Sequence, residues 1–154
     1  MNKSLKTMLG VTLLEIMLVL AIAGIIIAMS VRYFGQASTN QKVTSAISGI
    51  TAMVSAVEQW RLQGKALSSL TNDDIKSYFT ADSIPKSPWT NDPMTAKGGS
   101  VANTYVISTK TSDIGSCNLL ADQMSTQPGY TGVCSTGNAV DVTVNTVPGG
   151  GAAS

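Results

Sequence analysis

An unbroken apolar run near the N-terminus constrains this chain more than any other feature. Residues 11–31 read VTLLEIMLVLAIAGIIIAMSV, and Glu15 is the only charged residue among them. A helix of about 21 residues spans roughly 31 Å, which matches the hydrocarbon thickness of a bilayer. Lys3 and Lys6 precede the run and Arg32 follows it. Because the more positive flank stays in the cytoplasm, we predict a transmembrane helix with the C-terminal part of the chain translocated.

Two simpler kinds of apolar segment fit this run less well. A secretory signal peptide has an apolar region of about 7–15 residues and then a small-residue cleavage site. The run here is longer, although Ala28–Ser30 resembles such a site. A plain signal anchor has the right length but gives no reason for Glu15.

Glu15 is the residue in this run that most needs an explanation. A carboxylate inside a transmembrane helix costs about 2.5–3.5 kcal/mol, so it usually has a partner and a task. The positions one helical turn away hold no basic side chain: they are Val11, Thr12, Leu18 and Val19. Either the carboxyl group is protonated in the bilayer, or its partner comes from another chain. Cleavage between Gly10 and Val11 would create an α-amino group that could pair with the carboxylate of a neighbouring copy.

The residues around Glu15 resemble the signature of a known family. The stretch Gly10–Glu15, after a short basic leader and before an apolar helix, resembles the prepilin signature of type IV pilins and type II secretion pseudopilins. In that family a membrane peptidase cuts after the glycine and methylates the new N-terminus. The glutamate five residues after the glycine serves subunit docking. The resemblance implies cleavage between Gly10 and Val11, methylation of Val11 and an assembly role for Glu15.

Some positions depart from the commonest pilins. Those proteins have a shorter leader and begin with phenylalanine after cleavage, whereas here the leader has ten residues and Val11 follows. Many also carry a proline where this chain has Arg32. The departures favour type IVb-like pilins, whose first residue varies, but leaders in that subclass are often longer than this one. The subclass therefore stays open.

The resemblance implies an α+β fold, the pilin ladle, with a long N-terminal α-helix, a small antiparallel β-sheet and a disulfide-bracketed C-terminal loop. We expect a cleaved leader over residues 1–10 and the transmembrane, assembly half of the helix over residues 11–31. The globular head, including the amphipathic half of the helix, is expected over residues 32–154.

Helical signals continue beyond the apolar run. Apolar residues at steps of three and four predict an amphipathic helix that ends near Gly64. They are Val43, Ile47, Ile50, Val54 and Val57. Thr71 as N-cap with Asp74 three residues later predicts a short helix over residues 72–79. Ser116 is a candidate cap for another over residues 117–124.

The later part of the chain predicts strands and loops. Alternating apolar and polar residues predict strands over residues 104–109 and 139–147, the second with valines on one face. Glycine and proline content predicts irregular structure elsewhere. The segments concerned are 84–99, 129–137 and a disordered tail over 148–154.

Cys117 and Cys134 are the only cysteines. They do not form a C-x-x-C redox pair, and two thiols without any histidine make a poor zinc site. In a protein that has crossed a membrane, they are expected to form one disulfide, worth about 3 kcal/mol for a loop of this length. Two buried free cysteines in a cytosolic protein are the alternative.

Composition argues against catalysis and nucleic-acid binding. The chain has no histidine, so the commonest general base and metal ligand is missing. Ser83 and Lys86 match Ser-x-x-Lys, but Pro85 between them opposes the helix that this motif requires. Two of the ten basic residues lie in the predicted leader, which leaves eight against nine acidic residues and no net positive charge for phosphates. No enzyme activity, cofactor or metal ion is expected.

We therefore interpret the chain as a structural subunit, a major pilin, of a bacterial type IV pilus that serves adhesion, motility or aggregation. A minor pilin or a type II secretion pseudopilin is the alternative within the class, and pseudopilins usually lack a cysteine pair. A membrane-anchored exported enzyme or binding protein is the alternative from another class. Expected partners are copies of the chain in a helical fibre, the prepilin peptidase and the pilus assembly machinery. The expected location is the inner membrane and then the extracellular pilus.

Overall fold

The structure is a computed structural model that describes residues 12–80 and 84–146. The predicted cleavage and methylation site at Gly10 and Val11, the serine at 83 and the C-terminal tail lie outside the described residues. The chain divides into two compact units, an N-terminal unit (Met1–Ser38) and a C-terminal unit (Thr39–Ser154). Each is described by itself.

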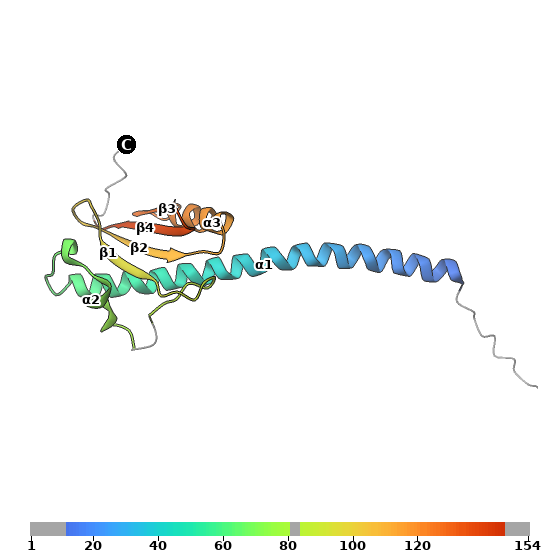
Figure 1. The fold of residues 1–154 in the computed structure, drawn as a ribbon, viewed down its shortest axis with the longest axis horizontal. Coiled ribbons are helices and arrows are strands. Elements are labelled where there is room, and N and C mark those ends of the chain that lie inside the picture. Colours follow the sequence, from blue (N-terminus) through green and yellow to red (C-terminus); the bar gives the residue numbers. More distant parts are fainter. Residues whose placement is uncertain (1–11, 81–83, 147–154) are drawn as a thin grey trace, which may run out of the picture. The chain divides into compact units, whose positions relative to one another are not determined.

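The long helix α1 spans Leu13–Arg61, so it begins in the N-terminal unit and ends in the C-terminal unit (Figure 1). The backbone N–H of Glu15 donates to the carbonyl oxygen of Thr12 at 3.0 Å and lies 3.3 Å from its hydroxyl oxygen. Thr12 therefore caps the helix. Gly64, the predicted stop, lies three residues beyond the last helical residue and has a φ of 80°, which glycine adopts at little cost.

The C-terminal unit contains a four-stranded sheet in which every neighbouring pair is antiparallel (Figure 1). Its strands are β1 (Thr95–Gly98), β2 (Thr104–Lys110), β3 (Tyr130–Ser135) and β4 (Ala139–Asn145). The spatial order is β1-β2-β4-β3, so the last strand lies between β2 and β3. Three short helical segments complete the unit: η1 (Leu67–Ser69), α2 (Asn72–Lys76) and α3 (Ile114–Ser125). The α+β architecture predicted from the sequence is confirmed.

One stripe of α1 supplies much of the core. Its buried residues recur at steps of three and four: Val43, Ala46, Ile50, Met53, Ala56, Val57 and Trp60. The predicted stripe is confirmed at Val43, Ile50 and Val57, while Ile47 and Val54 lie at its margin and are partly buried. The buried face is therefore rotated slightly toward smaller and aromatic residues. The sheet contributes Tyr105, Ile107, Val140, Val142 and Val144 to the same core.

Strand β4 has the predicted alternation, because its three even-numbered valines are buried and its other residues are half-buried.

Two expectations for loops were wrong. β1 lies within residues 84–99 and β3 lies within residues 129–137. Both strands are short and contain glycine, so local propensity is weak. Pairing with β2 and β4 makes them strands.

Capping explains both short α-helices. At α2 the predicted capping box is present: the Thr71 backbone N–H donates to the Asp74 carboxylate at 2.9 Å. The helix ends at Lys76, earlier than residues 72–79 predicted. At α3 the predicted cap was wrong, because Asp113 rather than Ser116 is the N-cap. The Asp113 carboxylate accepts the backbone N–H of Ser116 at 2.8 Å, so helix α3 begins three residues earlier than expected.

Candidate assembly surface

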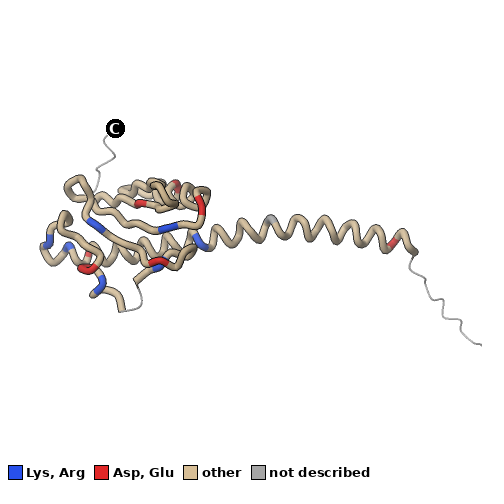
Figure 2. The backbone as a smooth tube through the Cα atoms, in the orientation of Figure 1, with Lys and Arg blue, Asp and Glu red and all other residues tan. Residues whose placement is uncertain are grey.

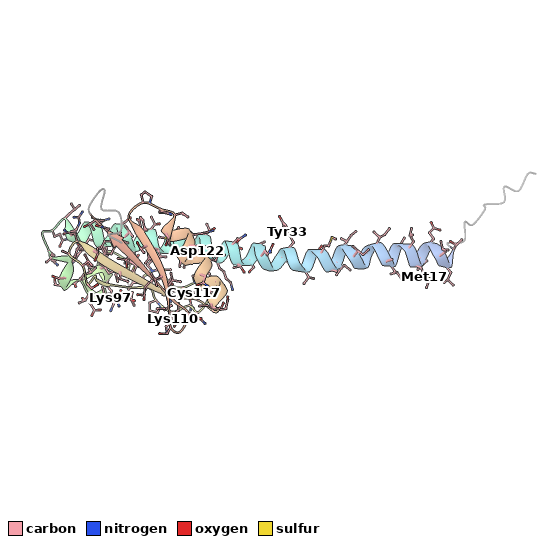
Figure 3. The ribbon with its side chains drawn as sticks, turned by 90° about the horizontal axis from the view of Figure 1, so that it is seen from above. Met17, Tyr33, Lys97, Lys110, Cys117 and Asp122 are labelled. Atoms are coloured by element: carbon pink, nitrogen blue, oxygen red, sulfur yellow. A yellow bond between two sulfur atoms is a disulfide. The ribbon has the colours of Figure 1, made fainter. Side chains whose placement is uncertain are left out.

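The described part of the N-terminal unit is an exposed apolar surface. Thirteen large apolar side chains between Leu13 and Val31 are at least half exposed, from 50% at Ile16 to 79% at Leu13. The most apolar 18-residue window of α1 has a mean hydropathy of 2.6 and no buried residue. By length and composition α1 could cross a membrane. The side chains, including those of Met17 and Tyr33, stand out from the helix (Figure 3).

Glu15 is the only acidic residue in this apolar surface (Figure 2). It lies in the first turn of α1, where a negative charge gains about 0.3–1 kcal/mol from the helix dipole. That gain offsets only part of the roughly 2.5–3.5 kcal/mol that the carboxylate costs in a bilayer. Within residues 12–80 and 84–146, no ion pair or hydrogen bond reaches the carboxylate. Part of the cost of a carboxylate in a bilayer therefore stays uncompensated by the described residues.

The spacing of Thr12 and Glu15 also carries a local signal that the sequence reading did not use. Thr-x-x-Glu is the capping-box pattern, with the threonine as N-cap and the glutamate at the third helical position. The threonine half is present in the structure, since Thr12 accepts the backbone N–H of Glu15. Glu15 therefore has a favourable place at the start of the helix in addition to any role between chains.

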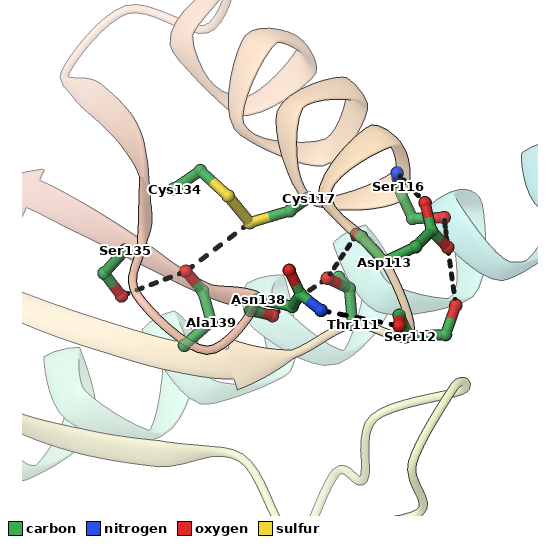
Figure 4. The surroundings of a disulfide bond; sticks show 9 residues. All are labelled: Thr111, Ser112, Asp113, Ser116, Cys117, Cys134, Ser135, Asn138 and Ala139. Atoms are coloured by element: carbon green, nitrogen blue, oxygen red, sulfur yellow. Dashed lines mark hydrogen bonds between the residues drawn. A yellow bond between two sulfur atoms is a disulfide. The ribbon is translucent and has the colours of Figure 1, made fainter.

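The C-terminal unit contains the predicted disulfide between Cys117 of α3 and Cys134 of β3 (Figure 4). The two Cα atoms are 5.8 Å apart and the residues are 17 positions apart in sequence. Cys117 is fully buried and Cys134 is half-buried. The Cys117 sulfur lies 3.5 Å from the carbonyl oxygen of Ala139. This is a contact rather than a hydrogen bond, because a disulfide sulfur carries no proton. The bond joins α3 to the sheet.

Hydrogen bonds hold the segment before α3 against the β3–β4 turn (Figure 4). The Thr111 hydroxyl donates to the Asn138 carbonyl oxygen at 2.8 Å. The hydroxyl of Ser112 and then the backbone N–H of Ser116 lower the pKa of Asp113 to about 2. The cap of α3 therefore stays ionised at neutral pH. Asp113 and the disulfide both hold the first turns of α3.

A buried titratable group lies on the core side of β2. Burial of Tyr105, and then the negative charge of Glu58, raise the pKa of the Tyr105 hydroxyl well above its ordinary value. Glu58 itself pairs with Arg61 at 2.7 Å near the end of α1. The buried Tyr105 hydroxyl oxygen has no hydrogen-bond partner among the described residues, and the raised pKa leaves Tyr105 neutral at physiological pH.

Metal-ligating side chains do not cluster in the described residues. Within residues 12–80 and 84–146, no three His, Cys, Asp or Glu side chains come together as metal ligands. Lys86 of the Ser-x-x-Lys match lies in an isolated bridge with Pro93 and not on a helix. A hollow of about 420 Å³ beside the end of α1 is lined by Arg61, Lys65 and uncharged residues.

Comparison with known proteins gives one kind of relative. No family model matches the chain. Two curated proteins, each named Fimbrial protein and from Pseudomonas aeruginosa, are 37% identical to it over 73 residues. The alignments cover 47% of this chain and 47% of each relative, so the chain matches about half the length of these proteins. No solved structure matches. The structure combines a long apolar N-terminal helix, a small antiparallel sheet and a C-terminal disulfide. Together with the similarity to a fimbrial protein, these features agree with the type IV pilin that the signature from Gly10 to Glu15 predicts.

Proposed function

We propose that the chain is a structural subunit, the major pilin, of a bacterial type IV pilus, and that copies polymerise through α1 into a helical fibre for adhesion, motility or aggregation. The observation that carries the proposal is the apolar surface of α1 with its single carboxylate. Burying one large aliphatic side chain is worth about 1.5–3 kcal/mol. Thirteen such side chains exposed to water are therefore strongly unfavourable, and the surface needs a cover.

Two covers fit this surface at different times. A bilayer covers it before assembly, with the C-terminal unit on the outer side of the inner membrane. Tyr33 and Phe34, both more than three-quarters exposed, lie just beyond Arg32 at the end of the apolar run. Aromatic residues are enriched at that level of a membrane, where their rings lie among the headgroups. Helices of neighbouring copies replace the lipid in the extracellular pilus.

Glu15 can set the register in which the helices of neighbouring copies pack, which an apolar surface alone does not do. Apolar helix surfaces pack on one another in many ways that differ little in free energy. Cleavage by the prepilin peptidase after Gly10 creates the α-amino group of Val11. An α-amino group has a pKa of about 8 in a model peptide, and it keeps its charge when methylated. Pairing this cation with Glu15 of a neighbour would compensate the carboxylate and align the two helices. The pilus assembly machinery would act on subunits held in this way.

The first test is the N-terminus of the protein purified from cells. Mass spectrometry should find a chain that begins at Val11 with a methylated amino group and contains 144 of the 154 residues. A chain that begins near Ser30 would instead identify a secretory signal peptide. An uncut chain as the sole species would also contradict the pilin proposal.

The second test is the yield of sheared surface fibres relative to total cellular protein. Glu15→Ala should still insert and be cut after Gly10, but should give at least tenfold fewer fibres, as expected when a buried charge pair worth more than about 1.4 kcal/mol is lost. Lys42→Ala is the matched control, because it removes an exposed charge from the same helix. It should assemble normally. Normal fibre yield from Glu15→Ala would refute the assembly role of Glu15, and fibres built chiefly of another protein would identify a minor pilin.

A further inference from the structure

The sheet of the C-terminal unit has two edge strands, β1 and β3. An edge strand presents unpaired backbone groups that can add a strand from another molecule, and proteins usually prevent this with charges, proline or a covering segment. β3 reads YTGVCS, with neither charge nor proline. Because a fibre brings many copies close together, an open edge of this kind would allow strands of different copies to pair with one another.

The edge of β3 is covered by α3. The backbone N–H of Gly132 donates to the hydroxyl oxygen of Ser125 at 2.9 Å, and that hydroxyl donates to the carbonyl oxygen of Ala121, also at 2.9 Å. The backbone N–H of Tyr130 donates to the carbonyl oxygen of Gln127 at 3.2 Å. Among the described strands only β4 lies beside β3, so donors that bond to α3 and the turn after it face away from the sheet. The outward N–H groups of Tyr130 and Gly132 are therefore already used.

The edge of β1 is covered in the same manner by a different segment. The backbone N–H of Ala96 donates to the side-chain oxygen of Asn72 at 3.2 Å. The backbone N–H of Gly98 donates to the carbonyl oxygen of Leu70 at 3.2 Å. Within residues 12–80 and 84–146 β1 pairs with no strand but β2, so both donors again face outward. The segment from η1 to α2 uses them within the chain.

A glycine on each edge strand permits this close cover. A Cβ atom at Gly132 would lie under 3.0 Å from backbone atoms of Ala121 in α3. A Cβ atom at Gly98 would lie equally close to the Leu67 carbonyl oxygen in η1. Any side chain at either position would push the covering segment away from its strand. The two edges therefore share one arrangement. In each, a glycine of the edge strand lies against a helical segment, and residues of that segment or next to it accept hydrogen bonds from outward N–H groups of the strand.

We propose that Ser125 and Asn72 close both sheet edges against strand addition, so that copies of this chain are left to join through α1. The closure is a property of the sheet alone, and only its consequence for fibres rests on the proposed function. One outward bond at each edge uses a side-chain oxygen, of Ser125 or Asn72, which a single substitution removes, and the other uses a backbone carbonyl oxygen.

Amide hydrogen exchange on the full chain in detergent micelles tests the closure without any fibre. Ser125→Ala should accelerate exchange at Gly132 about fivefold, the factor expected for one lost hydrogen bond, and Asn72→Ala should do the same at Ala96. Ser125→Thr keeps the hydroxyl oxygen and should restore protection. Ser55→Ala is the matched control, because the Ser55 hydroxyl donates to Thr51 within α1, away from the sheet. Unchanged exchange at Gly132 in Ser125→Ala, with the disulfide formed, would overturn the closure.

The double variant Ser125→Ala/Asn72→Ala tests the consequence. At equal concentration it should form thioflavin-positive, β-rich aggregates several times faster than the wild type, while either single variant falls between. Aggregation at the wild-type rate, with exchange accelerated at both edges, would show that open edges do not add strands and would overturn the proposal. A wild type that makes no pili would refute the proposed function while the exchange result stands.

Discussion

The disulfide makes a quantitative prediction about the stability of the C-terminal unit. Replacing both cysteines, Cys117→Ala/Cys134→Ala, removes a cross-link between residues 17 positions apart. The chain-entropy relation gives about 3 kcal/mol for a loop of this length. Loss of the fully buried Cys117 sulfur adds roughly 1 kcal/mol for the cavity that remains. We expect a total loss of about 3–4 kcal/mol in the free energy of unfolding.

Urea unfolding of the full chain in detergent micelles measures this loss. Fluorescence of Trp60, which is buried in the core, reports on the C-terminal unit. Each single cysteine variant breaks the same cross-link, so each should lose nearly as much as the double variant. Val133→Ala, an exposed residue on the same strand, is the control and should change stability by less than about 0.5 kcal/mol.

The outcome that refutes the reasoning is a double variant within 1 kcal/mol of the wild type. It would mean that α3 and β3 hold together without the bond, through the close contact at Gly132 and the cap at Asp113. Reducing the wild-type bond separates the two contributions, because reduction opens the loop but keeps both sulfurs. It should account for most of the loss.

Three further predictions concern other groups. Tyr105→Phe should reduce the fall in the free energy of unfolding at alkaline pH by up to about 1.4 kcal/mol per pH unit. The raised pKa of Tyr105 stabilises the fold below pH 10, and this stabilisation is lost as pH rises further. Urea unfolding with the same alkaline pH dependence in both proteins would contradict it. Asp113→Asn should keep the cap but make stability less sensitive to acid between about pH 4 and pH 2, because the lowered pKa stabilises the fold above the unfolded value and is lost as pH falls; matching acid titrations would count against this. Gly132→Ala should cost about 1–3 kcal/mol in urea unfolding, because its Cβ overlaps the backbone of Ala121, and a neutral result would show that α3 moves freely.

Features with a strong local signal were predictable from the sequence. The spacing of apolar residues marked the buried stripe of α1, although the stripe includes Ala46 and Trp60, which a search for branched residues passes over. The Thr71 cap and the alternation in β4 were equally local. Each of these elements satisfies its own periodicity before any tertiary contact is made.

Features made by tertiary contacts were not predictable in this way. β1 reads TAKG and becomes a strand because β2 pairs with one edge while Asn72 and the Leu70 carbonyl use the other. Asp113 was overlooked because serine and aspartate are both good caps, and only the fold shows which side chain reaches the free N–H groups. For Glu15 the sequence could identify a carboxylate without a nearby basic side chain, but the proposed partner on another chain would leave no periodic trace in this one.

The order of the strands in space has a consequence for how the protein is made. Of the four described strands β4 is the last along the chain, yet it lies between β2 and β3, and β3 pairs with no other of them. Synthesis runs from the N-terminus, so β3 stays unpaired until the ribosome has added residues 139–145. The C-terminal unit therefore closes late and in one step, and a polypeptide interrupted before Ala139 leaves two unpaired strand edges for proteases to recognise.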